Sequence, residues 1–184
     1  RKRKMNDFKL SVPKLKIERV WEMPNRYTFK LKTVKELLQE EMAGLWLDPF
    51  CGKGSPARIR NDADRALDAE CHMDGLKFLR AFHDETVHGV LFDPPYSVDQ
   101  ALRKYTPIQK GTAGRAEYWA KCKNEVARVI RIGGKAVCFG WDSTGVGKKR
   151  GFQLVRLILI CHGACHNDTI VTVEQKYNAP SIPL

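Results

Sequence analysis

The chain has 184 residues, of which 43% are hydrophobic and 29% charged, and this composition is ordinary for one globular domain with a sizeable core. No apolar run approaches the ~20 residues that a membrane span requires, and the first residues lack the apolar core of an export signal. The net charge of +11 predicts a polyanionic partner such as DNA or RNA, although a solvated basic surface would carry the same charge. We therefore expect a cytoplasmic protein that binds no membrane.

The first 20 residues are basic and weakly patterned, and we expect a loose arm ahead of a single domain over residues 21–184. A helix is expected to start near Thr33, whose hydroxyl can cap it, and to run to about Met42. Gly44 would end this helix.

Acidic residues end four successive predicted strands. These strands are expected over 45–48, 57–62, 69–74 and 89–93, with a short helix over 75–82. The carboxyl ends of parallel strands meet at one edge of a sheet, where ligands bind. A single acid there is often only a loop residue, but four in succession indicate a site. The four acids are Asp48, Asp62, Asp74 and Asp93.

The second half of the chain continues this alternation. Residues 97–116 hold few apolar residues, so we expect a long mobile loop, followed by an amphipathic helix over 117–131. A strand over 133–141 precedes two β-rich segments, 152–163 and 167–176, which predict a terminal hairpin. The pattern predicts an α/β fold with a mostly parallel sheet and an antiparallel edge.

Two motifs lie at strand ends. The stretch VLFDPPYS, residues 90–97, stops an apolar run with an acid, two prolines and a tyrosine. Because proline cannot donate a backbone hydrogen bond, no central strand continues through it. The stretch PFCGKGSP, residues 49–56, is a glycine loop without the spacing of a nucleotide-triphosphate loop.

Together these motifs resemble the amino-methyltransferases of nucleic acid, in particular the bacteriophage-type DNA adenine-N6 methyltransferases. RYTFKLKTVKELL (26–38) looks like that family's first cofactor segment, DPFCGKG (48–54) like its glycine motif and FDPPYS (92–97) like its catalytic motif. The resemblance covers most of the chain. It implies a Rossmann-like fold, S-adenosylmethionine as methyl donor, and duplex DNA with a flipped adenine as substrate, in the cytoplasm of a bacterial host cell.

The resemblance also implies catalytic roles. Asp93 and the carbonyl of Pro94 would accept the two hydrogens of the adenine amine, and Pro95 would help to hold both acceptors in a rigid corner. Tyr96 would stack on the flipped base. Because the methyl donor is already activated, neither a metal nor a covalent nucleophile is expected.

For the cofactor, the resemblance implies a position across the strand ends. The glycine loop would meet the methionine part, Asp62 the ribose hydroxyls and Asp74 the adenine amine. Thr28 and Phe29 would close over the cofactor, although Phe29 could also be a plain core residue. The expected cofactor-binding residues are Thr28, Phe29, Asp48, Pro49, Phe50, Gly52, Gly54, Asp62 and Asp74.

One departure from the family concerns the first crossover. Only nine residues separate Asp48 from Arg58, whereas a helical crossover between parallel strands needs a dozen or more. We therefore expect this helix to be missing or reduced to a turn.

The chain has no segment long enough for a separate target-recognition domain. Bases would be read by the loop at 97–116, by residues 141–151, by the arm, or by a second subunit, which includes a second copy in a homodimer. Five basic residues are expected to contact phosphates. They are Arg103, Lys104, Lys148, Lys149 and Arg150.

The stretch CHGACH, residues 161–166, holds two cysteines and two histidines, but its spacing fits neither a CxxC pair nor haem attachment. We expect a tight turn there and no metal, and the six scattered cysteines are expected to be reduced.

Two other functions stay open at this point. The first is an rRNA base-amine methyltransferase, since such families also place DPP[YF] after a glycine motif. The second is a non-catalytic nucleic-acid-binding subunit of a methyltransferase heterodimer. The intact DPPY and glycine motifs favour an active enzyme.

Overall fold

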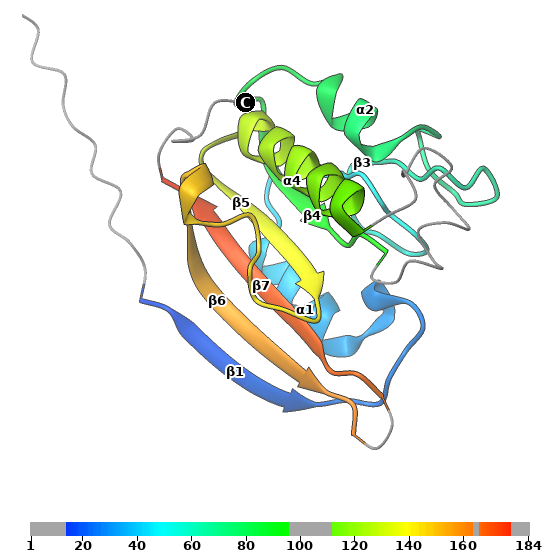
Figure 1. Ribbon diagram of the computed structural model, residues 1–184. Coiled ribbons are helices and arrows are strands. Elements are labelled where there is room, and N and C mark those ends of the chain that lie inside the picture. Colours follow the sequence, from blue (N-terminus) through cyan, green and yellow to red (C-terminus); the bar gives the residue numbers. More distant parts are fainter. Residues whose placement is uncertain (1–13, 96–111, 164–165, 178–184) are drawn as a thin grey trace, which may run out of the picture.

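The structure is a computed structural model that describes residues 14–95, 112–163 and 166–177. Its strands form one seven-stranded sheet in the order β1-β6-β7-β5-β4-β2-β3. Figure 1 shows α4 and α2 over one face of the sheet and α1 behind the other face. The elements are β1 (Lys16–Trp21), η1 (Thr28–Lys30), α1 (Lys32–Glu41), β2 (Trp46–Asp48), β3 (Ile59–Arg60), α2 (Gly75–Arg80), β4 (Val87–Phe92), α4 (Thr112–Val129), β5 (Ile130–Gly140), η2 (Lys148–Arg150), β6 (Phe152–Cys161) and β7 (Thr169–Lys176).

The predicted fold class is confirmed. β2 pairs in parallel with β3 and β4, β4 with β5, and β1 with β6. β7 lies antiparallel between β5 and β6, so the last two strands form the expected hairpin. The sheet is therefore mostly parallel, with an antiparallel segment built from the end of the chain.

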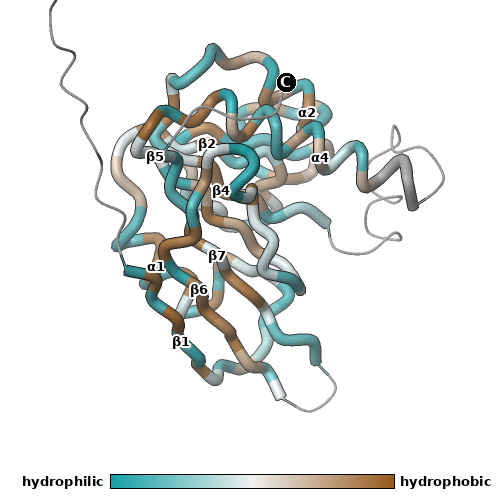
Figure 2. The backbone as a smooth tube through the Cα atoms, turned by 60° about the vertical axis from the view of Figure 1, so that its left-hand side comes forward, coloured by the Kyte–Doolittle hydropathy of each residue, from teal (hydrophilic) through white to brown (hydrophobic). Residues whose placement is uncertain are grey.

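Hydrophobic residues of the sheet pack against helices on both faces. On one face, Cys122 and Val126 of α4 contact a cluster that includes Phe92, as the period of the helix predicted. On the other face, Val34 of α1 packs in a cluster with Leu91. Each fully buried side chain of this size stabilises the fold by ~1.5–3 kcal/mol. Figure 2 shows the hydrophobic colouring along much of β6 and β7.

The first crossover has no helix, as its length predicted. Residues 49–58 connect β2 to β3 through turns alone. The expected strand over 69–74 is wrong, because only one isolated bridge forms, between Asn61 and Cys71. The side-chain amide of Asn61 bonds both the N–H and the carbonyl of Met73, at 3.0 and 2.9 Å. A side chain thus takes the place of the neighbouring strand.

The boundary of the N-terminal arm is corrected by the structure. Lys16–Trp21 forms the edge strand β1 and is not part of a loose arm. It pairs with β6 along its whole length. In addition, Val20 packs against the core beneath α1, and Glu18 forms an ion pair with Arg156 of β6. Both partners of β1 are distant in sequence, so its local pattern gave no sign of the strand.

The start of α1 is also corrected. The helix begins at Lys32, and the carboxylate of Glu22 accepts its first N–H groups, from Lys32 at 2.5 Å and from Thr33 at 3.0 Å. The cap therefore comes from the segment after β1 and not from the Thr33 hydroxyl.

The loop expected at 97–116 is wrong over its last residues, because α4 begins at Thr112. Residues 96–111 lie outside the described part of the chain. In that described part, no helix has the length and hydropathy needed to cross a membrane.

Candidate active site

The larger of two adjoining cavities lies at the carboxyl ends of β2, β3 and β4 and has a volume of about 500 Å³. Its walls come from the segment before α1, the glycine loop, the end of β3 and the turn after β4. It is lined by residues 25–29, 50–53 and 93–95, together with Asp62, Leu67 and Thr169.

Asp62 and Gly52 form the floor of this cavity. Asp62 is 2% exposed, and its carboxylate accepts the N–H of Gly52 at 3.0 Å and that of Asp64 at 2.9 Å. Gly52 has φ +51°, and the nearest atom to a Cβ placed there would be the carbonyl oxygen of Phe50 at 4.0 Å. A ligand can therefore approach this backbone closely.

Asp48 does not reach the cavity. It is fully buried and accepts the N–H of Phe50 at 2.9 Å and the hydroxyl of Ser55 at 2.6 Å. Burial raises the pKa of its carboxyl group to about 8, although these two hydrogen bonds act in the opposite direction. Asp48 thus shapes the glycine loop from inside.

Three other expected cofactor residues also lie elsewhere. Asp74 caps α2 by accepting the N–H of Lys77, and its second oxygen accepts the hydroxyl of Tyr118 at 2.6 Å. The carbonyl of Pro49 accepts the side-chain amide of Asn61, and Gly54 lines a separate groove beside α1. The expected cofactor residues that line the larger cavity are Thr28, Phe29, Phe50, Gly52 and Asp62.

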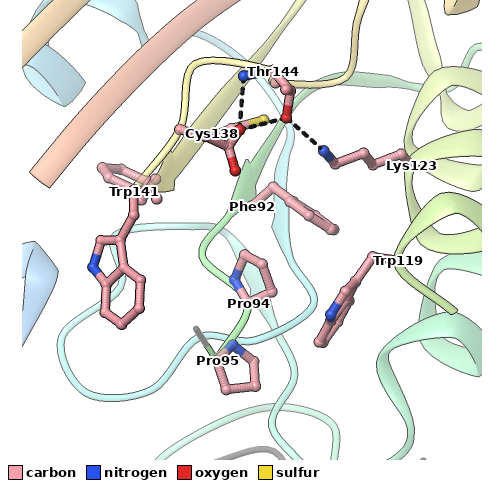
Figure 3. Close-up of a pocket in the computed structure, with 12 residues that line it drawn as sticks. Phe92, Pro94, Pro95, Trp119, Lys123, Cys138, Trp141 and Thr144 are labelled. Carbon is pink, nitrogen blue, oxygen red and sulfur yellow. Dashed lines mark hydrogen bonds between the residues drawn. The ribbon is translucent and has the colours of Figure 1, made fainter. Parts of the chain in front are cut away.

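A smaller cavity of about 220 Å³ adjoins the first, and Pro94 and Pro95 line both. Figure 3 shows these prolines between Trp119 of α4 and Trp141, which follows β5. Phe92 also lines this cavity, where its ring packs against that of Trp119 at 6.5 Å between centroids. The smaller cavity is therefore walled in part by aromatic rings, and Lys123, Asp142 and Thr144 add polar groups to its lining.

Glu174 of β7 holds the loop that carries Trp141. Glu174 is 4% exposed, and its carboxylate accepts the N–H groups of Val146 and Gly147. Burial raises the pKa of Glu174, and the bonds from these two N–H groups partly offset that effect. A Cβ on Gly145 would lie 2.2 Å from this carboxylate, so the loop requires glycine there.

Of the expected catalytic residues, Asp93 lines the larger cavity, and Pro94 and Pro95 line both cavities. Tyr96 lies outside the described residues, as do Arg103 and Lys104.

The structure places Lys148, Lys149 and Arg150 away from the two cavities. Their turn, η2, directly precedes β6. The start of β6 pairs with the end of β7, and the end of β7 pairs with the part of β5 near its start. Figure 1 shows η2 away from the tip of β5. Arg150 also donates to Asn124 of α4 at 2.6 Å and to the carbonyl of Val146 at 3.0 Å. These bonds fix Arg150 as a link between the loop and α4.

Sequence reasoning missed both tryptophans of the smaller cavity. Trp141 is the last residue of the strand predicted over 133–141 and could have been placed at the same edge as Asp93. Trp119 gave no such signal, because its helical spacing also fits an ordinary core residue.

The CHGACH segment connects β6 and β7, and its positions 164–165 lie outside the described residues; on either side of them, the N–H of His166 bonds the carbonyl of Gly163 at 3.2 Å. The ring of His162 is within hydrogen-bonding distance of the carbonyl of Glu22 and the hydroxyl of Thr169. The described part of the chain contains no group of three His, Cys, Asp or Glu residues that could hold a metal ion.

No protein-family model and no curated protein sequence matches the chain. Among solved structures it is similar to TrmN from Thermus thermophilus, with 16% identity and a TM-score of 0.54, over 80% of this chain and 49% of that one. It is also similar to 1,6-didemethyltoxoflavin-N1-methyltransferase from Burkholderia thailandensis, solved with S-adenosylhomocysteine, with 8% identity, a TM-score of 0.51 and coverage of 79% and 76%. The chain spans about half the length of TrmN. These similarities establish a Rossmann-like methyltransferase fold.

Proposed function

We propose that the protein transfers a methyl group from S-adenosylmethionine to the N6 amine of adenine in DNA. One observation carries this proposal. Pro94 and Pro95 form a wall shared by two cavities of different character, a larger one beside a glycine loop and a smaller one between tryptophans. A methyl donor and a flat acceptor held in these cavities would meet at Asp93.

The larger cavity fits the methyl donor. Its volume of about 500 Å³ lies in the range of small-molecule sites. Asp62 retains lone pairs beyond its two backbone bonds and can accept hydroxyl groups of a ribose, while the open backbone at Gly52 leaves room for the methionine part. When bound, S-adenosylmethionine supplies an electrophilic methyl group on its sulfonium sulfur.

Asp93 and Pro94 act on the acceptor. An exocyclic adenine amine is a poor nucleophile because its lone pair is delocalised into the ring. The Asp93 carboxylate and the Pro94 carbonyl can each accept one amine hydrogen, which turns the lone pair towards the donor. The two prolines restrict the backbone and hold these acceptors in place. Little conformational entropy is therefore lost when the transition state forms.

The smaller cavity supports a nucleobase as acceptor. Trp119 and Trp141 offer flat faces, and stacking on an aromatic ring stabilises a bound base by ~1–3 kcal/mol. A base reaches such a pocket only from a single strand or after flipping out of a duplex. The net charge of +11 favours a polyanionic carrier of that base.

Transfer of radiolabelled methyl groups to duplex DNA, single-stranded DNA and structured RNA tests the proposal. Digestion to nucleosides and mass spectrometry should identify N6-methyladenine from DNA. If only RNA is labelled, the methyl acceptor is a base amine of RNA and not of DNA. No transfer to any nucleic acid would contradict it.

A further inference from the structure

Three cationic side chains surround one tyrosine ring at the rim of the larger cavity. The guanidinium carbon of Arg26 lies 5.0 Å from the centroid of the Tyr27 ring. The ammonium nitrogens of Lys30 and Lys53 lie 5.3 and 5.5 Å from the same centroid. We refer to Arg26, Tyr27, Lys30 and Lys53 as the Tyr27 patch.

The cations of the Tyr27 patch form no ion pair in the described part of the chain, although Asp62 and Asp93 line the same cavity. Within the described ranges, none of the three cations has a carboxylate within 4 Å, whereas buried or half-buried cations such as Arg128 and Arg156 are paired. The three cations are exposed and lie within about one Debye length of one another, ~10 Å at 0.1 M salt. The ring attracts each cation only by ~0.5–1 kcal/mol at an exposed site, so a positive potential remains there.

The fold fixes the two segments that make the patch. Phe29, between two of the cations, packs edge-on against Phe139 of β5 at 5.6 Å, and Glu22 caps the helix that follows. The backbone before Lys53 is held by the bond from Gly52 to Asp62. The cations therefore converge because two separate loops are anchored at the same edge of the sheet.

The position of the Tyr27 patch indicates which ligand it can bind. Arg26, Tyr27 and Lys53 line the larger cavity, while Lys30 lies outside that lining. We infer that the Tyr27 patch binds successive phosphates of the nucleic-acid strand that carries the target base. This inference rests on the proposed function, and it moves the nucleic-acid contact from η2 to the segment before α1 and the glycine loop.

Neutralising the patch tests the inference. The variant Arg26→Gln/Lys30→Gln/Lys53→Gln keeps side-chain length and removes three charges. The control Lys77→Gln/Lys148→Gln/Lys149→Gln removes three exposed charges on α2 and η2, so both variants have the same net charge. Binding of a labelled DNA duplex and of an RNA of the same sequence is measured against salt concentration, and donor binding is measured by calorimetry.

We expect the patch variant to bind DNA at least tenfold more weakly at low salt. The slope of log affinity against log salt should fall by about two to three, because each lost phosphate contact removes ~0.9 in duplex DNA. The control should keep the slope within about one unit of wild type and donor affinity within about twofold. In the patch variant, donor affinity should fall by a smaller factor than DNA affinity, because Arg26 and Lys53 also line the larger cavity. Lys30→Gln alone, outside the cavity lining, should lower the slope by about one.

Several results would overturn the inference. Equal slopes in both triple variants would mean that net charge alone matters. A loss of donor affinity as large as the loss of DNA affinity would assign the patch to the donor's carboxylate. Binding to anionic lipid vesicles that depends on the patch, without binding to DNA or RNA, would make it a membrane contact. A wild-type protein that binds DNA but transfers no methyl group would contradict the proposed function. The comparison of DNA binding between the patch variant and the control would still test the inference.

Discussion

The carboxylate of Asp62 accepts the N–H of Gly52, and the two residues follow adjacent strands, β3 and β2. The glycine loop is thus braced from the neighbouring strand end. Asp48 braces it from below through Phe50 and Ser55. These bonds satisfy backbone groups that a helix would otherwise pair, which explains how the crossover can do without one.

Gly52→Leu should weaken donor binding at least tenfold, because a side chain at this position would project into the larger cavity. Gly54→Leu is the matched control. Both glycines have positive φ, +51° and +90°, so both substitutions strain the backbone. Gly54 does not line the larger cavity. Calorimetry with S-adenosylmethionine should show weaker binding to the Gly52→Leu variant than to the Gly54→Leu variant. Equal affinities of the two variants would mean that the glycine loop is not part of the donor site.

Asp93→Ala should lower the rate of methyl transfer by on the order of a hundredfold or more, the usual scale for a group that handles protons in the transition state. Donor affinity should change by less than about twofold, since Asp93 is proposed to act on the amine. Single-turnover assays at saturating donor measure the rate, with the exposed Asp68→Ala as control. Near-normal turnover in Asp93→Ala would rule out its proposed role.

Trp141→Ala should raise the dissociation constant for DNA by about tenfold, within the ~1–3 kcal/mol range of base stacking. Trp21→Ala serves as control, because Trp21 is 66% exposed on β1, compared with 55% for Trp141. Fluorescence anisotropy with a DNA duplex that contains a mismatched adenine is the appropriate measurement. If both variants bind like wild type, the smaller cavity does not receive the base.

Asp48 should make the wild-type fold less stable as pH rises. Burial raises its pKa to about 8 in the fold, whereas an aspartate in the unfolded chain ionises near ~3.9. Between these values the unfolded chain releases a proton that the fold retains, so stability falls by up to ~1.4 kcal/mol per pH unit.

Asp48→Asn can still bond Phe50 and Ser55, and it cannot ionise. Compared with wild type, its free energy of unfolding in urea should therefore increase between pH 5 and pH 8. Parallel pH profiles for the two proteins would show that Asp48 is already ionised in the fold.

The sequence by itself determined those elements that depend only on residues near one another in the chain. The apolar spacing of the second half of α4 and the proline pair after β4 depend only on neighbouring residues, and both were predicted correctly. The missing crossover helix followed from chain length alone. The sequence also placed Asp93 and the glycine loop at one edge, because parallel strands end on the same side.

Tertiary structure decided which of those edge residues face a cavity. Asp48 turns inward to Ser55, Asp74 turns to Tyr118 of α4, and Arg150 is held by Asn124. The partners of Asp74 and Arg150 lie on α4 and are brought close by its packing, so no pattern within a short window contains them. Ser55 is seven residues from Asp48, but the sequence does not show that the carboxylate turns towards it.

The same holds for residues that sequence reasoning did not bring together. Trp119 and Trp141 meet across the smaller cavity because α4 packs over β4 and β5, and Lys53 reaches Tyr27 because two loops end at one edge of the sheet. Side-chain type sets what such residues can bind. Their convergence depends on long-range strand pairing and helix packing, which fix distances between positions far apart in the chain.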